Sequence, residues 1–199
     1  MKLFHLSDLH IGKRVNEFSM IEDQKYILKR ILDLAEEEKP DGIILAGDIY
    51  DKQIPSAEAV QVFDEFITRL AGRAIPVFII SGNHDSAERL AFGGRLLNSR
   101  GIYLSPVYDG SVTKIPLKDQ YGTVWIHLLP FIRPSTVRHV FENEADLVTD
   151  VQTAAETVIR HMEIDLKDRN ILVAHQFVTG ASRCESEDVQ VGGLDNIDA

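Results

Sequence analysis

Gly42-Ile43-Ile44-Leu45-Ala46 is a short apolar run, and the polar motif Gly47-Asp48-Ile49-Tyr50-Asp51 follows it directly. Short apolar runs bounded by glycine or proline are typical of buried strands. This stretch therefore predicts a buried strand that ends in a group of polar side chains.

Three other predicted strands end in the same way. The polar motifs are Ser7-Asp8-Leu9-His10 after Leu3–Leu6, Gly82-Asn83-His84-Asp85 after Val77–Ile80, and the isolated His175 after Asn170–Ala174. In an open parallel sheet, ligands collect at the carboxyl ends of the strands. The side chains that we expect to share one site are those of Asp8, His10, Asp48, Asn83 and His175.

Helical patterns separate the first three strands. Ser19-Met20-Ile21-Glu22 resembles a capping box, and apolar residues at helical spacing continue from it to Lys39-Pro40. A second helix is expected from Ser56, and a third after Asp85 is expected to break at Gly93-Gly94. The inner face of the second helix is predicted to consist of Val60, Phe63, Ile67 and Leu70.

The second half of the chain has a different pattern. Turn residues interrupt short β-like pieces between Gly101 and Leu129, which predicts antiparallel strands. A helix from about Asp150 to Met162 leads to the last strand, and Phe177 to Ala199 is expected to be a loop. The βαβα start predicts a parallel core sheet. The expected fold is therefore α/β, with two packed mixed β-sheets flanked by helices.

Composition restricts the class of protein. The 199 residues suffice for one domain with a sizeable core, and 44% of them are hydrophobic. The chain begins in a strand pattern without a cationic and apolar leader, and Cys184 is its single cysteine, so we expect a cytoplasmic protein that does not enter a membrane. A net charge of −10 argues against a broad basic surface for nucleic acid.

The predicted site has the chemistry of a divalent cation site. Carboxylate, imidazole and amide groups are ligands for hard to borderline divalent cations. Asp8 and His10 are two residues apart, and side chains at this spacing on an extended strand end point the same way. Asp48 has two oxygens and could bridge two cations. Gly47 and Gly82 are expected to let the backbone bend tightly before the polar residues.

These motifs resemble those of the calcineurin-like metallophosphoesterase family, which has D-x-H, G-D-x-x-D, G-N-H-D/E, a lone His and G-H-x-H in this order. Within the family, they are most similar to DNA repair nucleases that act with an ATPase subunit. The four ordered motifs make this a specific signal, whereas one motif alone would be weak. The resemblance implies a four-layer sandwich and metal-dependent hydrolysis of phosphodiester bonds in DNA.

The resemblance also implies roles for single residues. Asp8, His10 and Asp48 would hold one metal, and Asp48, Asn83 and His175 would hold the other, with manganese as the preferred ion. His84 would assist the leaving group, and Asp85 would orient the His84 ring by a hydrogen bond. Asp51 would either contact a water molecule at the metals or cap the next turn. Two metals about 3.5–4 Å apart would activate the attacking water.

The final G-H-x-H motif does not occur within the 199 residues. We therefore expect residues 1–199 to be an incomplete metallophosphoesterase domain, without the capping and ATPase-binding segments of the similar nucleases. The expected partners are DNA and the ATPase subunit, and homodimer formation is left open.

Two alternatives to a DNA nuclease are left open. One is a related phosphoesterase that acts on nucleotides or phosphoproteins, because the motifs specify the reaction better than the substrate. The other is a binding scaffold that keeps the fold and has lost catalysis. For each polar residue taken alone, strand-end capping or turn formation is a further explanation, since Asp and Asn favour such positions.

Overall fold

The computed structural model describes residues 1–178 and 196–197. Its strands are β1 (Leu3–Leu6), β2 (Arg14–Val15), β3 (Phe18–Ser19), β4 (Gly42–Ala46), β5 (Val77–Ile80), β6 (Ile102–Leu104), β7 (Thr113–Asp119), β8 (Gly122–Leu128), β9 (Arg169–Val173), β10 (Phe177–Val178) and β11 (Asn196–Ile197). Its helices are α1 (Ile21–Glu38), α2 (Ala57–Ala71), α3 (Ala87–Leu90), α4 (Gly94–Leu97), α5 (Pro134–Val140) and α6 (Val151–His161), with 3₁₀ helices η1 (Asn98–Arg100) and η2 (Glu142–Leu147).

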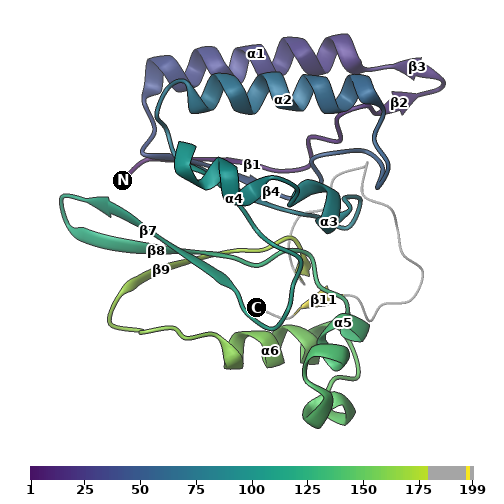
Figure 1. The fold of residues 1–199 in the computed structure, drawn as a ribbon, viewed down its shortest axis with the longest axis vertical. Coiled ribbons are helices and arrows are strands. Elements are labelled where there is room, and N and C mark those ends of the chain that lie inside the picture. The colour runs from purple at the N-terminus through teal and green to yellow at the C-terminus, as the bar shows by residue number, and fades with distance from the viewer. Residues whose placement is uncertain (179–195, 198–199) are drawn as a thin grey trace.

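Two sheets lie at the centre of the fold. The larger has the strand order β1-β4-β5-β6 with parallel neighbours, and the smaller has the order β7-β8-β9. Helices α1 and α2 lie outside the larger sheet, and α5 and α6 lie on the far side of the smaller one (Figure 1). These four layers confirm the expected α/β fold with two packed sheets and flanking helices.

Strand pairing differs from the prediction in the second half of the chain. β6 pairs in parallel with β5, although the sequence after Gly101 predicted antiparallel strands throughout. A crossover through α3 and α4 connects the two strands, and such a connection produces parallel pairing. Antiparallel pairing joins β7 to β8, while β9 lies parallel to β8. The short parallel pair β10–β11 replaces part of the predicted loop from Phe177, and residues 179–195 lie outside the described residues.

Three clusters of buried side chains fill the spaces between the four layers. Alternate residues of β4 contribute to different clusters: Ile43 and Leu45 pack toward the helices, whereas Ile44 and Ala46 pack toward the second sheet. Alternate residues of β5 belong to the same two clusters. Successive side chains of a strand point to opposite faces, so these continuous apolar runs are explained by burial on both faces.

Helix starts agree with the sequence in one case and differ in another. Ser56 is the N-cap of α2 as predicted, and its Oγ accepts a hydrogen bond from the backbone three residues on. The predicted capping box of α1 is wrong, because Met20 is the N-cap and Ser19 belongs to the short hairpin β2–β3. Val60 is 44% exposed and is not part of the inner face of α2.

Among the described residues, no helix is long and apolar enough to cross a membrane.

Candidate metal centre

The segments that follow β1 and β4 stay paired beyond the ends of the strands. The Asp8 N–H donates to the Gly47 carbonyl at 3.2 Å, and the His10 N–H donates to the Asp48 carbonyl at 2.9 Å. A further parallel bridge joins Ile11 to Tyr50. The first two polar motifs are therefore fixed side by side by their main chains.

Three of the predicted ligand residues have left-handed backbone conformations. The φ angles are 57° at Asp8, 42° at His10 and 49° at Asp48. The expectation that Asp8 and His10 project from one extended strand end is therefore wrong. Such conformations cost on the order of 1–3 kcal/mol each in residues other than glycine, and they cluster at functional sites.

Asp48 is the central residue of the site and is 3% exposed. Its Oδ1 accepts a hydrogen bond from the His84 N–H at 2.9 Å. Its Oδ2 lies 3.7 Å from His10 Nε2 and 3.5 Å from His175 Nε2. His175 follows β9 of the smaller sheet, so the carboxylate of Asp48 lies between side chains from both sheets.

Two groups of potential ligand atoms share Asp48. One consists of Asp8, Asp48 and His175, and the other of His10, Asp48 and His84, with the atoms of each group within 4.8 Å of one another. Asn83 Oδ1 lies 3.2 Å from His175 Nε2. The structure thus brings all five predicted ligand residues together, and their role as ligands stays a prediction. It also places His84 near Asp48, and the division of these residues between two metal ions stays a prediction.

Gly47 and Gly82 are required because other groups approach them closely. A Cβ on Gly47, where φ is +88°, would lie 2.5 Å from His175 Nδ1. A Cβ on Gly82 would lie 2.1 Å from Asp48 Oδ1 and 2.3 Å from the Asp48 nitrogen. Gly47 is required both by its positive φ, the tight bend that was predicted, and by the approach of His175, whereas close approach to Asp48 alone explains Gly82.

Asp85 has a different function from the one predicted. Its carboxylate accepts backbone hydrogen bonds from Gly82 at 2.9 Å, Ile49 at 3.1 Å and Tyr50 at 2.9 Å. Burial raises the pKa of Asp85, and these hydrogen bonds oppose that effect. The prediction that Asp85 orients the His84 ring is therefore wrong, because its oxygens join the turn after β4 to the turn after β5.

The ring of His84 instead approaches the main chain of Asp51. Its Nδ1 lies 3.2 Å from the Asp51 carbonyl oxygen, and its ring meets that of His10 edge to face at 4.9 Å. The Asp51 carboxylate lies 3.9 Å from His10 Nδ1. Both predicted roles of Asp51, contact with a water molecule and turn capping, stay predictions.

The surroundings of Asp8 and Asp48 lower the pKa values of both carboxyl groups and keep them ionised. The His10 side chain, whose Nε2 lies 3.7 Å from Asp8 Oδ1, lowers the pKa of Asp8 to about 2, although burial opposes this shift. Burial also opposes ionisation of Asp48, but hydrogen bonds from the His175 ring and the His84 backbone outweigh it and lower the pKa of Asp48. Both groups can therefore act as anionic ligands at neutral pH.

The donor set fits divalent metal ions. Two anionic carboxylates, an amide oxygen and imidazole nitrogens suit hard to borderline cations. His10 Nδ1 is buried and has no hydrogen-bond partner among the described residues. The side chains that could hold metal ions are those of Asp8, His10, Asp48, Asn83 and His175.

Sequence reasoning missed the residues that support the first motif. The Ser7 hydroxyl lies within hydrogen-bond distance of Asp8 Oδ2 and of the Ala46 carbonyl, and it donates its single proton to one of them at a time. Gln24 donates to the His10 carbonyl at 2.7 Å and accepts from the Gly12 N–H at 2.9 Å. Gln24 lies within α1, and no local sequence pattern indicates that its side chain reaches back to the motif.

Comparison with known protein families identifies the family of this chain. Residues 1–193 match the family described as calcineurin-like phosphoesterase, and the chain belongs to this family. Two relatives both carry the name of the D component of the nuclease SbcCD. The protein from Staphylococcus saprophyticus is 32% identical over 202 residues, and that from Staphylococcus epidermidis is 34% identical over 202 residues.

Each alignment covers 100% of this chain and 52% of the relative, so the chain spans about half the length of these curated relatives. A solved structure of Yfce, a phosphoesterase from E. coli, is 16% identical, with a TM-score of 0.33 over 64% of this chain and 56% of that one. This similarity is too low to support an argument, and the family assignment rests on the sequence match. Members of the family use divalent metals, in agreement with the donor set around Asp48.

Proposed function

We propose that this chain contains the catalytic core of a metal-dependent DNA nuclease, the nuclease subunit of an SbcCD-like repair complex. The observation that carries the proposal is the position of Asp48, which is buried between His10 and His175 within two overlapping groups of potential ligands. The relatives named as the D component of the nuclease SbcCD support the choice of DNA as substrate.

Five side chains would hold two divalent ions, with manganese as the proposed metal. When bound, the ions would supply charge neutralisation for the phosphodiester and activation of water for in-line attack. Asp48 would be a ligand shared by both ions, a role supported by the position of its carboxylate between His10 and His175. The main-chain pairing after β1 and β4 would keep Asp8 and Asp48 in fixed positions during the reaction.

His84 would deliver a proton to the leaving oxygen. A carbonyl oxygen only accepts hydrogen bonds, so the contact of His84 Nδ1 with the Asp51 carbonyl favours a proton on Nδ1. Nε2 is then the nitrogen left for the substrate, and it would give a proton to the leaving oxygen from a ring that is protonated on both nitrogens. In this assignment the Asp51 main chain orients His84, and Asp85 acts by fixing the turns on which Asp48 and Asn83 lie.

An SbcC-like ATPase subunit is the proposed protein partner. A chain with a net charge of −10 does not gather DNA by charge alone, so a partner would have to contribute to DNA binding. We assign the capping segment, the ATPase-binding segment and the G-H-x-H ligands to sequence outside these 199 residues. The proposed location is the cytoplasm, where a bacterial chromosome is accessible.

The test compares three substrates of the full-length natural protein with its ATPase partner and Mn²⁺. They are linear duplex DNA, a cyclic dinucleotide and a phosphopeptide. We expect duplex DNA to be cleaved fastest, with loss of cleavage after chelation of the metal. Faster turnover of either other substrate would support the related phosphoesterase, and no turnover of any would support the scaffold.

A further inference from the structure

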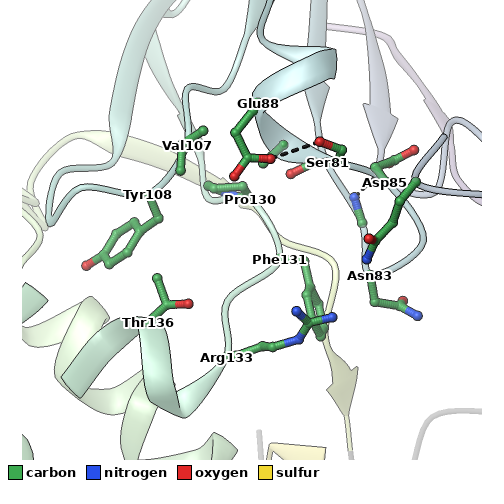
Figure 2. A pocket seen from close by; sticks show the side chains of 14 residues that line it. Ser81, Asn83, Asp85, Glu88, Val107, Tyr108, Pro130, Phe131, Arg133 and Thr136 are labelled. Carbon is green, nitrogen blue, oxygen red and sulfur yellow. Dashed lines mark hydrogen bonds between the residues drawn. The ribbon is translucent and has the colours of Figure 1, made fainter. Parts of the chain in front are cut away.

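A hollow of about 250 Å³ lies beside the candidate metal centre, between the turn after β5 and the segment before α5. Figure 2 shows Glu88 on one side, Tyr108 and Thr136 on another, and Arg133 on a third. Asn83 lines the hollow and also lies 3.2 Å from His175 Nε2. The Asn83 side chain therefore separates the hollow from the candidate metal centre and contacts both.

Phe131 and Arg133 form a wall between this hollow and a second one of about 450 Å³, because both residues line both hollows. The wall is held from two directions. The Phe131 N–H donates to the Ser81 carbonyl at 2.8 Å, and Gln176 Nε2 donates to the Ile132 carbonyl at 3.3 Å. The hollow is thus formed before any ligand arrives, which reduces the entropic cost of binding.

The charged groups of the hollow are arranged at opposite sides. Arg133 is exposed, its guanidinium carbon lies 5.7 Å from the centre of the Phe131 ring, and no described residue forms an ion pair with it. On the other side, Glu88 accepts a hydrogen bond from the Ser86 hydroxyl at 2.9 Å. Both oxygens of Asp85, the third charged lining residue, are occupied by backbone N–H groups. Glu88 is therefore the carboxylate that remains available to a ligand.

This arrangement suits a nucleobase. Val107, Pro130 and Phe131 provide apolar sides for a flat ring. The volume is below the roughly 300–1,000 Å³ typical of sites for drug-sized ligands, so one ring system fits better than a whole nucleotide. The Glu88 carboxylate repels phosphate and accepts N–H groups, whereas the Arg133 guanidinium attracts phosphate.

We propose that the hollow binds the base of the nucleotide next to the scissile phosphate, with Glu88 accepting a hydrogen bond from the amino group of the base and Arg133 contacting the phosphate. The inference rests on the proposed nuclease function. Adenine, cytosine and guanine carry an exocyclic amino group, whereas thymine has none. The N–H on the thymine ring lies between two carbonyl oxygens, which a carboxylate repels, so the site should disfavour thymine.

Equilibrium binding tests the proposal without requiring turnover. The full-length protein with Mn²⁺ is titrated with dCMP, dTMP and 2-deoxyribose 5-phosphate, which has no base. We expect dCMP to bind about 2- to 10-fold more tightly than dTMP, the usual effect of one hydrogen bond, and deoxyribose phosphate to bind most weakly. Glu88→Ala should remove the difference between dCMP and dTMP. Arg133→Ala should weaken all three ligands and keep that difference.

Glu142→Ala is the matched control, because Glu142 is exposed and lies outside the hollow. It should leave all three affinities unchanged. Equal binding of dCMP and dTMP by the wild type, or a difference that survives in Glu88→Ala, would overturn the proposal. Cleavage of bis(p-nitrophenyl) phosphate, a phosphodiester without a base, separately tests the nuclease function. It should be the same for wild type and Glu142→Ala, and its absence in both would count against the proposed metal centre and leave the binding result for the hollow unaffected.

Discussion

His84 is the residue whose proposed role depends most on geometry. Its backbone N–H contacts Asp48, and its ring contacts the Asp51 carbonyl, so it lies close to the predicted metal ligands. Proximity alone does not distinguish a ligand from a proton donor. The distinction requires turnover and metal content to be measured on the same variant.

We predict that His84→Ala lowers kcat by about 10²- to 10⁴-fold, the usual contribution of a general acid or base, and leaves the metal content unchanged. Steady-state cleavage and elemental analysis of the full-length protein provide the two readouts. His139→Ala, a change of an exposed histidine on α5, serves as the control. Loss of metal from His84→Ala would show that His84 is a ligand.

Asp85 shows what the sequence could not predict. Its motif correctly placed it beside the ligands, but its hydrogen-bond donors include Ile49 and Tyr50, which are 36 and 35 residues away. Partners at such distances depend on the pairing of whole strands. Local patterns do not reveal them.

We predict that Asp85→Ala lowers the free energy of unfolding by about 3–5 kcal/mol, because three backbone N–H groups at a largely buried site lose their acceptor. Asp85→Asn keeps one acceptor oxygen and should cost less. Denaturant unfolding of both variants measures the difference. Equal stability of wild type and Asp85→Ala would refute the structural role assigned to this carboxylate.

At the scale of elements, the sequence predicted the strands well and their pairing less well. β4 and β5 are continuous apolar runs because each is buried on both faces, and this pattern is visible without a structure. The pairing of β6 was not predictable from its three residues, since the crossover before it determines its direction. The turns after the strands were recognised from their glycines, but the crowding at Gly82 comes from another strand end.

We predict that Gly82→Ala lowers metal affinity by about 10- to 100-fold, the usual effect of disturbing groups that orient a ligand. The new methyl group would overlap the Asp48 main chain and carboxylate, which must then move. Gly72→Ala is the matched control, because a Cβ there meets its nearest atom at an ordinary 3.5 Å. Calorimetric titration with Mn²⁺ measures both, and equal affinities would contradict the crowding argument.

At the scale of the whole molecule, two sheets from different halves of the chain meet at the candidate centre. The larger sheet supplies Asp8, Asp48 and Asn83, and the smaller one supplies His175. The sequence predicted a shared site because His175, like the other residues, follows a predicted strand. It did not predict that this strand belongs to the second sheet, since the position of His175 relative to Asp48 depends on how the sheets pack. The Phe131–Arg133 wall arises from the same packing and has no signature in the sequence.

We predict that residues 1–199 alone cleave linear duplex DNA much more slowly than the full-length protein with its ATPase partner. The curated relatives are about twice as long, and the remaining half is where we place the further ligands and the segments that position DNA. Mn²⁺-dependent cleavage by both preparations is the measurement. Comparable rates would show that residues 1–199 suffice.

The central claim is that two metal ions lie on either side of Asp48. Anomalous diffraction from crystals of the full-length protein grown with Mn²⁺ tests it most directly. We predict two manganese peaks about 3.5–4 Å apart, both in contact with the Asp48 carboxylate, with His10 at one ion and His175 at the other. A single peak, or two peaks that do not contact Asp48, would contradict the claim.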